Sequence, residues 1–249
     1  MKILAYLICA LIAALLFRAS ADFPDWGDPN SPASTEVSAY YLEHAMHDTE
    51  VPNVVSAVLA DYRGFDTMWE TTVVLIAALA IIFLLRRSSY DLDYRPVEYT
   101  DLPQQNPITM VACRLLIPIM QIFALYVVIH GHHSPGGGFQ GGVILGATFI
   151  LHAMAFGMHN TLAFFSEKRA RVLAYYGVII FAGIGALCMV AGGNFLDYGA
   201  LSQFIPLSTA ETRSLTILFV ELGVALTVMS VMFSIYIDLA SAGDLDKGL

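Results

Sequence analysis

Six long apolar stretches constrain this chain more than any other feature of its sequence. A helix needs about 20 predominantly apolar residues to cross a hydrocarbon core of about 30 Å. Apolar residues make up 57% of the chain and charged residues 13%, whereas soluble globular proteins carry about 25% charged residues. The sequence therefore predicts an all-α, polytopic integral membrane protein with about six transmembrane helices. These are expected near residues 3–17, 67–85, 108–129, 139–158, 172–191 and 214–237.

Charge and cysteine content argue against several other classes of protein. The formal net charge is −9, whereas a nucleic-acid binder needs a basic surface, so no nucleic-acid partner is expected. The three cysteines lie far apart in apolar runs, which favours neither a disulfide framework nor a CxxC metal site. The polar segments are too short for a catalytic domain and carry no nucleophile–base or nucleotide motif. We therefore expect neither enzymatic activity nor a cofactor.

The first apolar stretch has two interpretations. It is short, and Ala19-Ser20-Ala21 resembles a signal-peptidase site. Lys2 and Arg18 can instead reach the two membrane interfaces and extend a short span, so we expect a retained helix. Cytoplasmic loops hold an excess of Lys and Arg. An inside N-terminus places most of these residues in the cytoplasm, which predicts a multi-pass protein of the cell (inner) membrane with both termini cytoplasmic.

Polar segments divide the chain. Residues 22–50 show no helical or strand periodicity and are expected to form an external loop. Residues 53–62 have apolar positions at three- and four-residue steps, typical of a short helix in the membrane interface or docked on a partner. Residues 89–106 are interpreted as a cytoplasmic linker. It separates a two-helix module, 1–88, from a four-helix module, 107–249.

The segment HGHHSPGGGFQGG, residues 130–142, joins the third and fourth predicted helices. Its glycines permit positive φ angles and close helix contacts, and it lacks the Lys-Ser/Thr ending of a phosphate-binding loop. We expect a tight hairpin packed against a partner. The histidine spacing could present two imidazoles to a metal, but no cysteine lies nearby; we expect no metal and interpret these histidines as interfacial. The structural motif residues are His132, Pro135, Gly136, Gly137, Gly138, Phe139, Gly141 and Gly142.

Ionisable residues inside the predicted helices form a second signal. A charge at the helix centre costs roughly 2.5–3.5 kcal/mol, so a retained one usually faces the bundle interior or a water-filled path. Glu221 lies about two turns inside the sixth helix. Glu70, near the start of the second, and His152, in the fourth, are the other ion-path candidates. Arg114, in the third, is interpreted as structural; for the others, ion conduction and interhelical hydrogen bonding both stay open.

The glycine-rich segment, the VILGATFIL run after it and the late FVELGVALTVMS together resemble the B subunit (MnhB-type domain) of multisubunit Mrp-type Na+/H+ antiporters. That family carries an R-G-H-N-x-P-G-G-G-F-x-G-G loop and an acidic residue before a Gly-Val in its last helix. Here His130 replaces the usual Arg and His133 the usual Asn, while Glu221 takes the acidic position.

Residues 53–81 resemble a different domain, the E subunit of membrane-bound hydrogenases, which also occurs at the C-terminal end of the large A subunit of the antiporter. The run from Asp61 to Glu70 matches that family's D-F-R-G-F-D-T-x-x-E pattern, with Tyr62 in place of its first Phe. The resemblance assigns Asp61, Arg63 and Asp66 to the structural motif.

Together the resemblances imply a membrane subunit of an Mrp-type antiporter that supports assembly and lines an ion path. Its partners would be the other subunits, including large antiporter-like ones, the lipid bilayer, and Na+ and/or H+. One alternative is a subunit of the Mrp-like, ion-translocating module of a membrane-bound [NiFe] hydrogenase or related oxidoreductase. The other is a purely structural assembly subunit.

Overall fold

A computed structural model describes residues 2–85 and 106–241. Every regular element in these ranges is helical, and six of the helices are long and apolar enough to cross a membrane. Contacts divide the chain into two units, Met1–His44 and Ala45–Leu249. In chain order the elements are α1 (Lys2–Ser20), η1 (Ala33–Val37), α2 (Ser38–Thr49), α3 (Val54–Ala57), η2 (Val58–Tyr62), α4 (Gly64–Leu85), α5 (Pro107–Ile129), α6 (Gly138–Phe156), α7 (Met158–Phe164), α8 (Glu167–Val190), η3 (Tyr198–Gln203) and α9 (Thr209–Ala240).

The six predicted crossings correspond to α1, α4, α5, α6, α8 and α9, which confirms the predicted fold class. Their ends differ from the apolar runs because polar caps and backbone angles set them. The Ser208 hydroxyl accepts from the Glu211 N–H and the Glu211 carboxylate from the Ser208 N–H, so α9 starts before its apolar run. Gly157, at φ +93°, ends α6 and separates it from α7.

The expectation of an external loop over residues 22–50 is wrong, because η1 and α2 occupy part of it. α2 mixes Ala, Tyr, Leu and Met with polar and charged residues, so it does not stand out as an apolar stretch. Local contacts one helical turn apart hold it instead: the rings of Tyr40 and His44 stack at 4.3 Å, and the Thr49 hydroxyl donates to the Ala45 carbonyl at 2.7 Å. The predicted short helix over residues 53–62 is present as α3 and η2.

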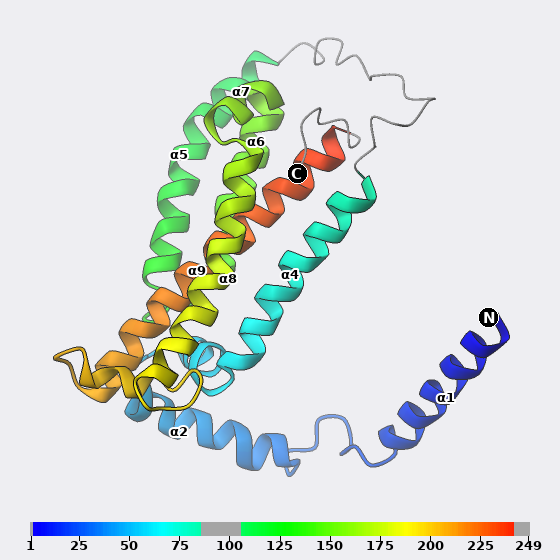
Figure 1. Cartoon of the computed structure of the whole chain (residues 1–249), viewed down its shortest axis with the longest axis vertical. Helices are drawn as coiled ribbons and strands as arrows, with labels where there is room; N and C mark the ends of the chain where they lie inside the picture. The colour runs from blue at the N-terminus through cyan, green and yellow to red at the C-terminus, as the bar shows by residue number, and fades with distance from the viewer. Residues whose placement is uncertain (1, 86–105, 242–249) are drawn as a thin grey trace. The chain divides into compact units, whose positions relative to one another are not determined.

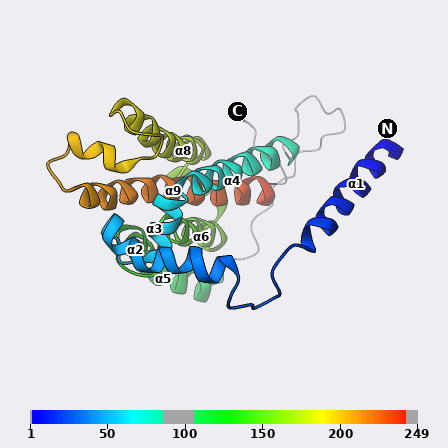
Figure 2. The same cartoon turned by 90° about the horizontal axis from the view of Figure 1, so that it is seen from below.

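In the second unit, α9 is the central helix (Figures 1 and 2). Of its most apolar window, 67% is buried, against 22–33% for α4, α5, α6 and α8. It packs against all four of these helices. Glycines allow the closest approaches: Gly177 of α8 lies against Gly223 and Thr227 of α9. At 32 residues, α9 is about 48 Å long at about 1.5 Å per residue, and it runs obliquely past α5 and α6 (Figure 1).

The helices α4, α5, α6, α8 and α9 alternate in direction, as Figure 1 shows. One end of the bundle therefore holds the α5–α6 connection, η3 and the start of α9. The opposite end holds the end of α4, the start of α5, α7 and the end of α9. Residues 89–105 of the predicted linker and the basic residues Arg86, Arg87, Arg95 and Lys247 lie outside the described residues, and the division into modules 1–88 and 107–249 stays a prediction.

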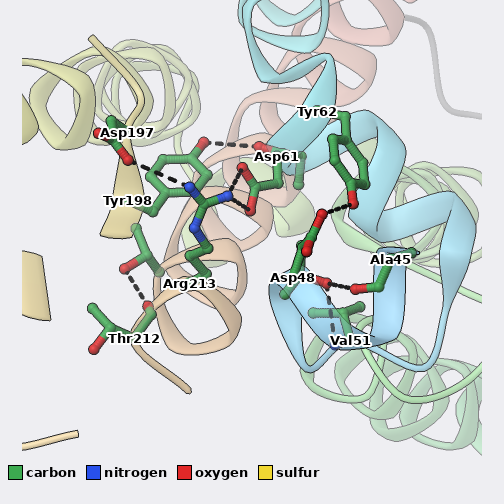
Figure 3. Close-up of polar contacts among 12 residues, drawn as sticks. Ala45, Asp48, Val51, Asp61, Tyr62, Asp197, Tyr198, Thr212 and Arg213 are labelled. Atoms are coloured by element: carbon green, nitrogen blue, oxygen red, sulfur yellow. Dashed lines mark hydrogen bonds and ion pairs between the residues drawn. The ribbon is translucent and has the colours of Figure 1, made fainter. Parts of the chain in front are cut away.

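An ion-pair network ties the two predicted modules together where η2 meets the start of α9 (Figure 3). Arg213 donates to both carboxylate oxygens of Asp61 at 3.0 and 3.1 Å and to Asp197 at 3.4 Å. Burial raises the pKa of Asp61, and the Arg213 guanidinium opposes that rise. Beside it, buried Tyr198 donates to the Ala60 carbonyl at 2.9 Å. Arg213 is therefore the main counter-charge of a largely buried carboxylate.

We expect the substitution Arg213→Met to destabilise the purified protein in detergent by about 3 kcal/mol, because it leaves the Asp61 carboxylate without its cation. Arg63→Met is the matched control, since Arg63 pairs with Asp66 at the exposed start of α4 and such pairs contribute about 1 kcal/mol or less. Adding Asp61→Asn to Arg213→Met should restore part of the loss. Equal unfolding midpoints for the two single variants would contradict the role of this ion pair.

Candidate functional site: a carboxylate-lined cavity

A cavity of about 170 Å³ lies where α3, η2, α4, the start of α6 and α9 meet. Two acids predicted from separate parts of the sequence line the same cavity: Glu70 on α4, which is exposed, and Glu221 on α9, which is 7% exposed. The cavity thus leads from an exposed carboxylate to a buried one. None of its lining residues is basic. Its polar side chains are Ser56, Thr67, Glu70, Thr71, Gln140 and Glu221.

Close contacts with glycines surround Glu221, and no basic side chain lines its cavity. Its Oε2 atom is buried and has no hydrogen-bond partner among the described residues. A Cβ placed on Gly131 would lie 2.8 Å from that atom, and one on Gly137 would lie 3.1 Å from Oε1. A Cβ on Gly138 would collide with the Glu221 backbone carbonyl. The glycine-rich segment and Glu221 therefore pack directly against each other.

The first turn of α6 gives this carboxylate a favourable electrostatic neighbour. Gly137 is the N-cap of α6, has φ +142° and offers no side chain to cap the helix. The first N–H groups of a helix lack intrahelical partners and carry partial positive charge. Because Gly137 lies against the Glu221 carboxylate, the positively polarised end of α6 is a close neighbour of this carboxylate.

The predicted hairpin connects α5 and α6, and it packs on residues of the same chain. The Asn53 side-chain amide donates to the carbonyls of Gly131 at 2.7 Å and Ser134 at 2.9 Å. The Asn53 backbone N–H donates to the His132 carbonyl at 3.2 Å. Ser56 donates to the Gly131 carbonyl at 2.7 Å. A short helix of the first predicted module thus fixes the loop of the second.

The cavity hydroxyls are arranged to present oxygen lone pairs. Ser56, Thr67 and Thr71 each donate to a backbone carbonyl, at 2.7, 2.6 and 2.8 Å. A hydroxyl whose hydrogen is committed in this way keeps acceptor lone pairs, and one of those on Ser56 accepts from the Asn53 side-chain amide at 3.0 Å. Carboxylates, hydroxyls and an amide form an oxygen-rich lining, which is the ligand type that suits hard cations and hydrated protons.

His152 and Arg114 lie apart from the cavity. His152 is on α6, where its Nδ1 is 2.8 Å from the Thr161 hydroxyl of α7. The face of α6 that meets α9 carries Gly142 and Gly146. His152 lies about 240° round the helix from Gly146, at roughly 100° per residue. Arg114 is on an exposed face of α5, and its predicted structural role is untested.

The other predicted motif residues surround the site. Pro135 is exposed, whereas Gly136 and Phe139 line the cavity. Gly141 packs on Ala124 and Val128 of α5, and Gly142 packs on Ala225 of α9. His132 is half-buried. Across the described residues, no group of three or more His, Cys, Asp or Glu side chains is placed to hold a metal ion.

The sequence did not identify four residues of the site, which are Asn53, Ser56, Thr71 and Gln140. Asn53 carried a local signal, because it precedes a short helical pattern and caps α3 by accepting from the Val55 N–H at 3.1 Å. Its bonds to the loop some 80 residues away had no such signal.

Three known proteins have sequences similar to this chain. A protein of Methanocaldococcus jannaschii is 32% identical over 67% of this chain, and a protein of Rhizobium meliloti named as the A/B component of a K+/H+ antiporter is 28% identical over 84%. The chain spans 64% of the first relative's length and 22% of the second's. A protein of Staphylococcus haemolyticus named as the antiporter component mnhB2 is 30% identical over 56% of this chain and 97% of its own length.

Two solved structures share the fold. One is a chain of the membrane-bound sulfane sulfur reductase, an archaeal respiratory membrane complex, with a TM-score of 0.63 and 25% identity over 96% of this chain and 97% of that one. The other is a chain of the Mrp complex from Dietzia sp. DQ12-45-1b, with a TM-score of 0.65 and 27% identity over 99% of this chain and 27% of that one.

Both sequence resemblances are confirmed by family matches. Residues 28–106 match the MbhE family, described as the E subunit of MBH. Residues 108–234, about half of the chain, match the domain related to the MnhB subunit of Na+/H+ antiporters. This multi-pass membrane protein therefore belongs to the MnhB-related family.

Proposed function

We propose that this chain is a membrane subunit of a multisubunit, Mrp-type cation/H+ antiporter, in which it supports assembly and lines part of an ion path. Its partners are the other subunits, including large antiporter-like ones, the lipid bilayer, and the transported ions, Na+ and/or H+. The family match and the relatives named as antiporter subunits support this function. In this proposed function, the chain carries out no catalysis of its own.

The observation that carries the ion-path role is the buried Glu221 carboxylate in a cavity that also reaches Glu70. A buried charge is costly unless it is paired, hydrogen-bonded or able to bind a mobile cation. No basic residue lines this cavity. We infer that Glu221 and Glu70 bind and release H+ or a monovalent cation as hydration of the cavity changes.

The outer helices offer surface for lipid and for neighbouring subunits. On α5, for example, Ile108, Leu115 and Ile122 are 66–78% exposed. An exposed apolar face of this size is unfavourable in water and favourable against hydrocarbon or another helix. We infer a location in the cell (inner) membrane with both termini cytoplasmic. Lys168 and Arg169 at the start of α8 support this orientation.

A second function has a specific observation in its favour. The match to the chain of the respiratory complex covers 97% of that chain and 96% of this one. The protein could therefore serve the ion-translocating module of a membrane-bound [NiFe] hydrogenase or related oxidoreductase. Neighbouring genes discriminate the two: antiporter subunits alone favour the first function, whereas hydrogenase-like subunits favour the second.

The substitution Glu221→Gln should lower cation-dependent proton transport at least roughly tenfold, the effect of about 1.4 kcal/mol, while the assembled complex is retained. The amide keeps the size of the side chain but cannot ionise. Transport is measured with a pH-sensitive dye in vesicles that contain the whole complex, and assembly by native electrophoresis.

Glu36→Gln is the control, because Glu36 is an exposed acid on η1. A Glu221→Gln complex that assembles normally and transports at the wild-type rate would sink the ion-path role. Loss of assembly, or unchanged transport, would favour the purely structural alternative.

Cysteine accessibility tests the orientation. In a Cys9→Ser background, which removes the exposed native thiol, His133→Cys reports the α5–α6 connection and His159→Cys reports α7 at the opposite end. Both positions are exposed. An impermeant thiol reagent added to intact cells should modify the cysteine at 133 and spare the one at 159. The reverse pattern would overturn the orientation with cytoplasmic termini.

A further inference from the structure

A second cavity, of about 270 Å³, lies at the same end of the bundle as the α5–α6 connection. We call it the loop-side basin. Two acids, two imidazoles and a hydroxyl line it, and they come from three parts of the chain. Its principal lining residues are Glu50, His132, His133, Glu211, Ser214 and Leu218.

The basin and the Glu221 cavity lie in line along one face of α9. Residues three, four and seven apart share a helix face. Ser214 and Leu218, which line the basin, therefore lie on the same face as Glu221. Leu218 is less than one turn from Glu221, so the two cavities are separated along α9 by about one helical turn.

Gly131 and His132 are adjacent residues of the α5–α6 loop; the first lies against Glu221 and the second lines the basin. Gly131 contacts the Glu221 carboxylate, since a Cβ there would lie 2.8 Å from Oε2. The next residue, His132, lines the basin. Its Nδ1 is buried and has no hydrogen-bond partner among the described residues. Asn53 holds its backbone carbonyl at 3.2 Å, so the ring is carried by a fixed segment of the loop.

Burial and two neighbouring histidines keep the His132 ring neutral near pH 7. Burial lowers the pKa of His132, and the neighbouring His133 and His130 lower it further. The His133 ring lies 4.2 Å away. Glu50, between α2 and α3, and Glu211 of α9 are the acids that line the basin. Glu221 lies beyond Gly131.

We propose that His132 passes protons between the loop-side basin and Glu221. The neutral ring takes a proton at one nitrogen from water in the basin and becomes imidazolium. It then releases the proton on its other nitrogen toward the Glu221 carboxylate, directly or through water in the cavity, and is neutral again. One proton is transferred, and no other reactant is needed. This relay rests on the proposed function, because it supplies the ion-path role of Glu221.

The test uses vesicles that contain the whole complex and compares His132→Gln with His159→Gln. His159 is the control, since it is an exposed imidazole on α7, at the opposite end of the bundle from the basin. His132→Gln should lower proton transport roughly tenfold, within the range by which a positioned proton-transfer group acts. It should also remove the inflection of the transport rate near or below the ordinary imidazole pKa of about 6.5. His159→Gln should keep the rate and the inflection.

Rescue separates a relay from a structural role. Added imidazole should restore transport in an assembled His132→Ala complex, because a small diffusible base can take the vacant position; an assembled complex that imidazole leaves inactive would overturn the relay. So would an assembled His132→Gln complex with the wild-type pH profile. If Glu221→Gln blocks transport and His132→Gln does not change it, the relay alone fails. If Glu221→Gln transports normally, the proposed function itself fails.

Discussion

The close contact between the glycine-rich loop and Glu221 is the constraint on which the rest of the site depends. Three glycines, at 131, 137 and 138, occupy positions where a single methyl group would meet the Glu221 side chain or backbone. Their missing side chains let the positive end of α6 approach a carboxylate that has no basic neighbour lining its cavity. A substitution that filled this space would have to move either α6 or the acid.

This contact explains why α9 must lie at the centre of the second unit. Its residue 221 has to face the α5–α6 loop, while Arg213, two turns earlier, pairs with Asp61 of η2. Helices α6 and α8 approach α9 through glycines, at Gly142 and Gly177. A polar site is thus held within an apolar bundle by close backbone packing, which is how membrane helices associate when hydrophobic burial provides no driving force.

The sequence predicted the helices well and the contacts between them poorly. Apolar length and the cost of burying charge are local properties, so the crossings and the burial of Glu221 in the bundle interior could be predicted. Which residues meet across the bundle is not local. Glu221 and His152 looked alike as polar groups inside apolar helices, yet only Glu221 lies on a face that borders the cavity. Likewise, α2 was missed because its apolar residues are interspersed with polar and charged ones and its stacked and hydrogen-bonded neighbours are not visible in the sequence.

The cavity also gives a physical reason for two family domains to occur in one chain. Glu70 and Ser56 belong to the part that matches the MbhE family, whereas Glu221 and the glycine loop belong to the MnhB-related part. Neither part alone encloses the two carboxylates. Asn53 and the Asp61–Arg213 pair then fix the relative position of the two parts at two points. Covalent linkage keeps these groups at high effective concentration, and every residue that lines the cavity comes from this one chain.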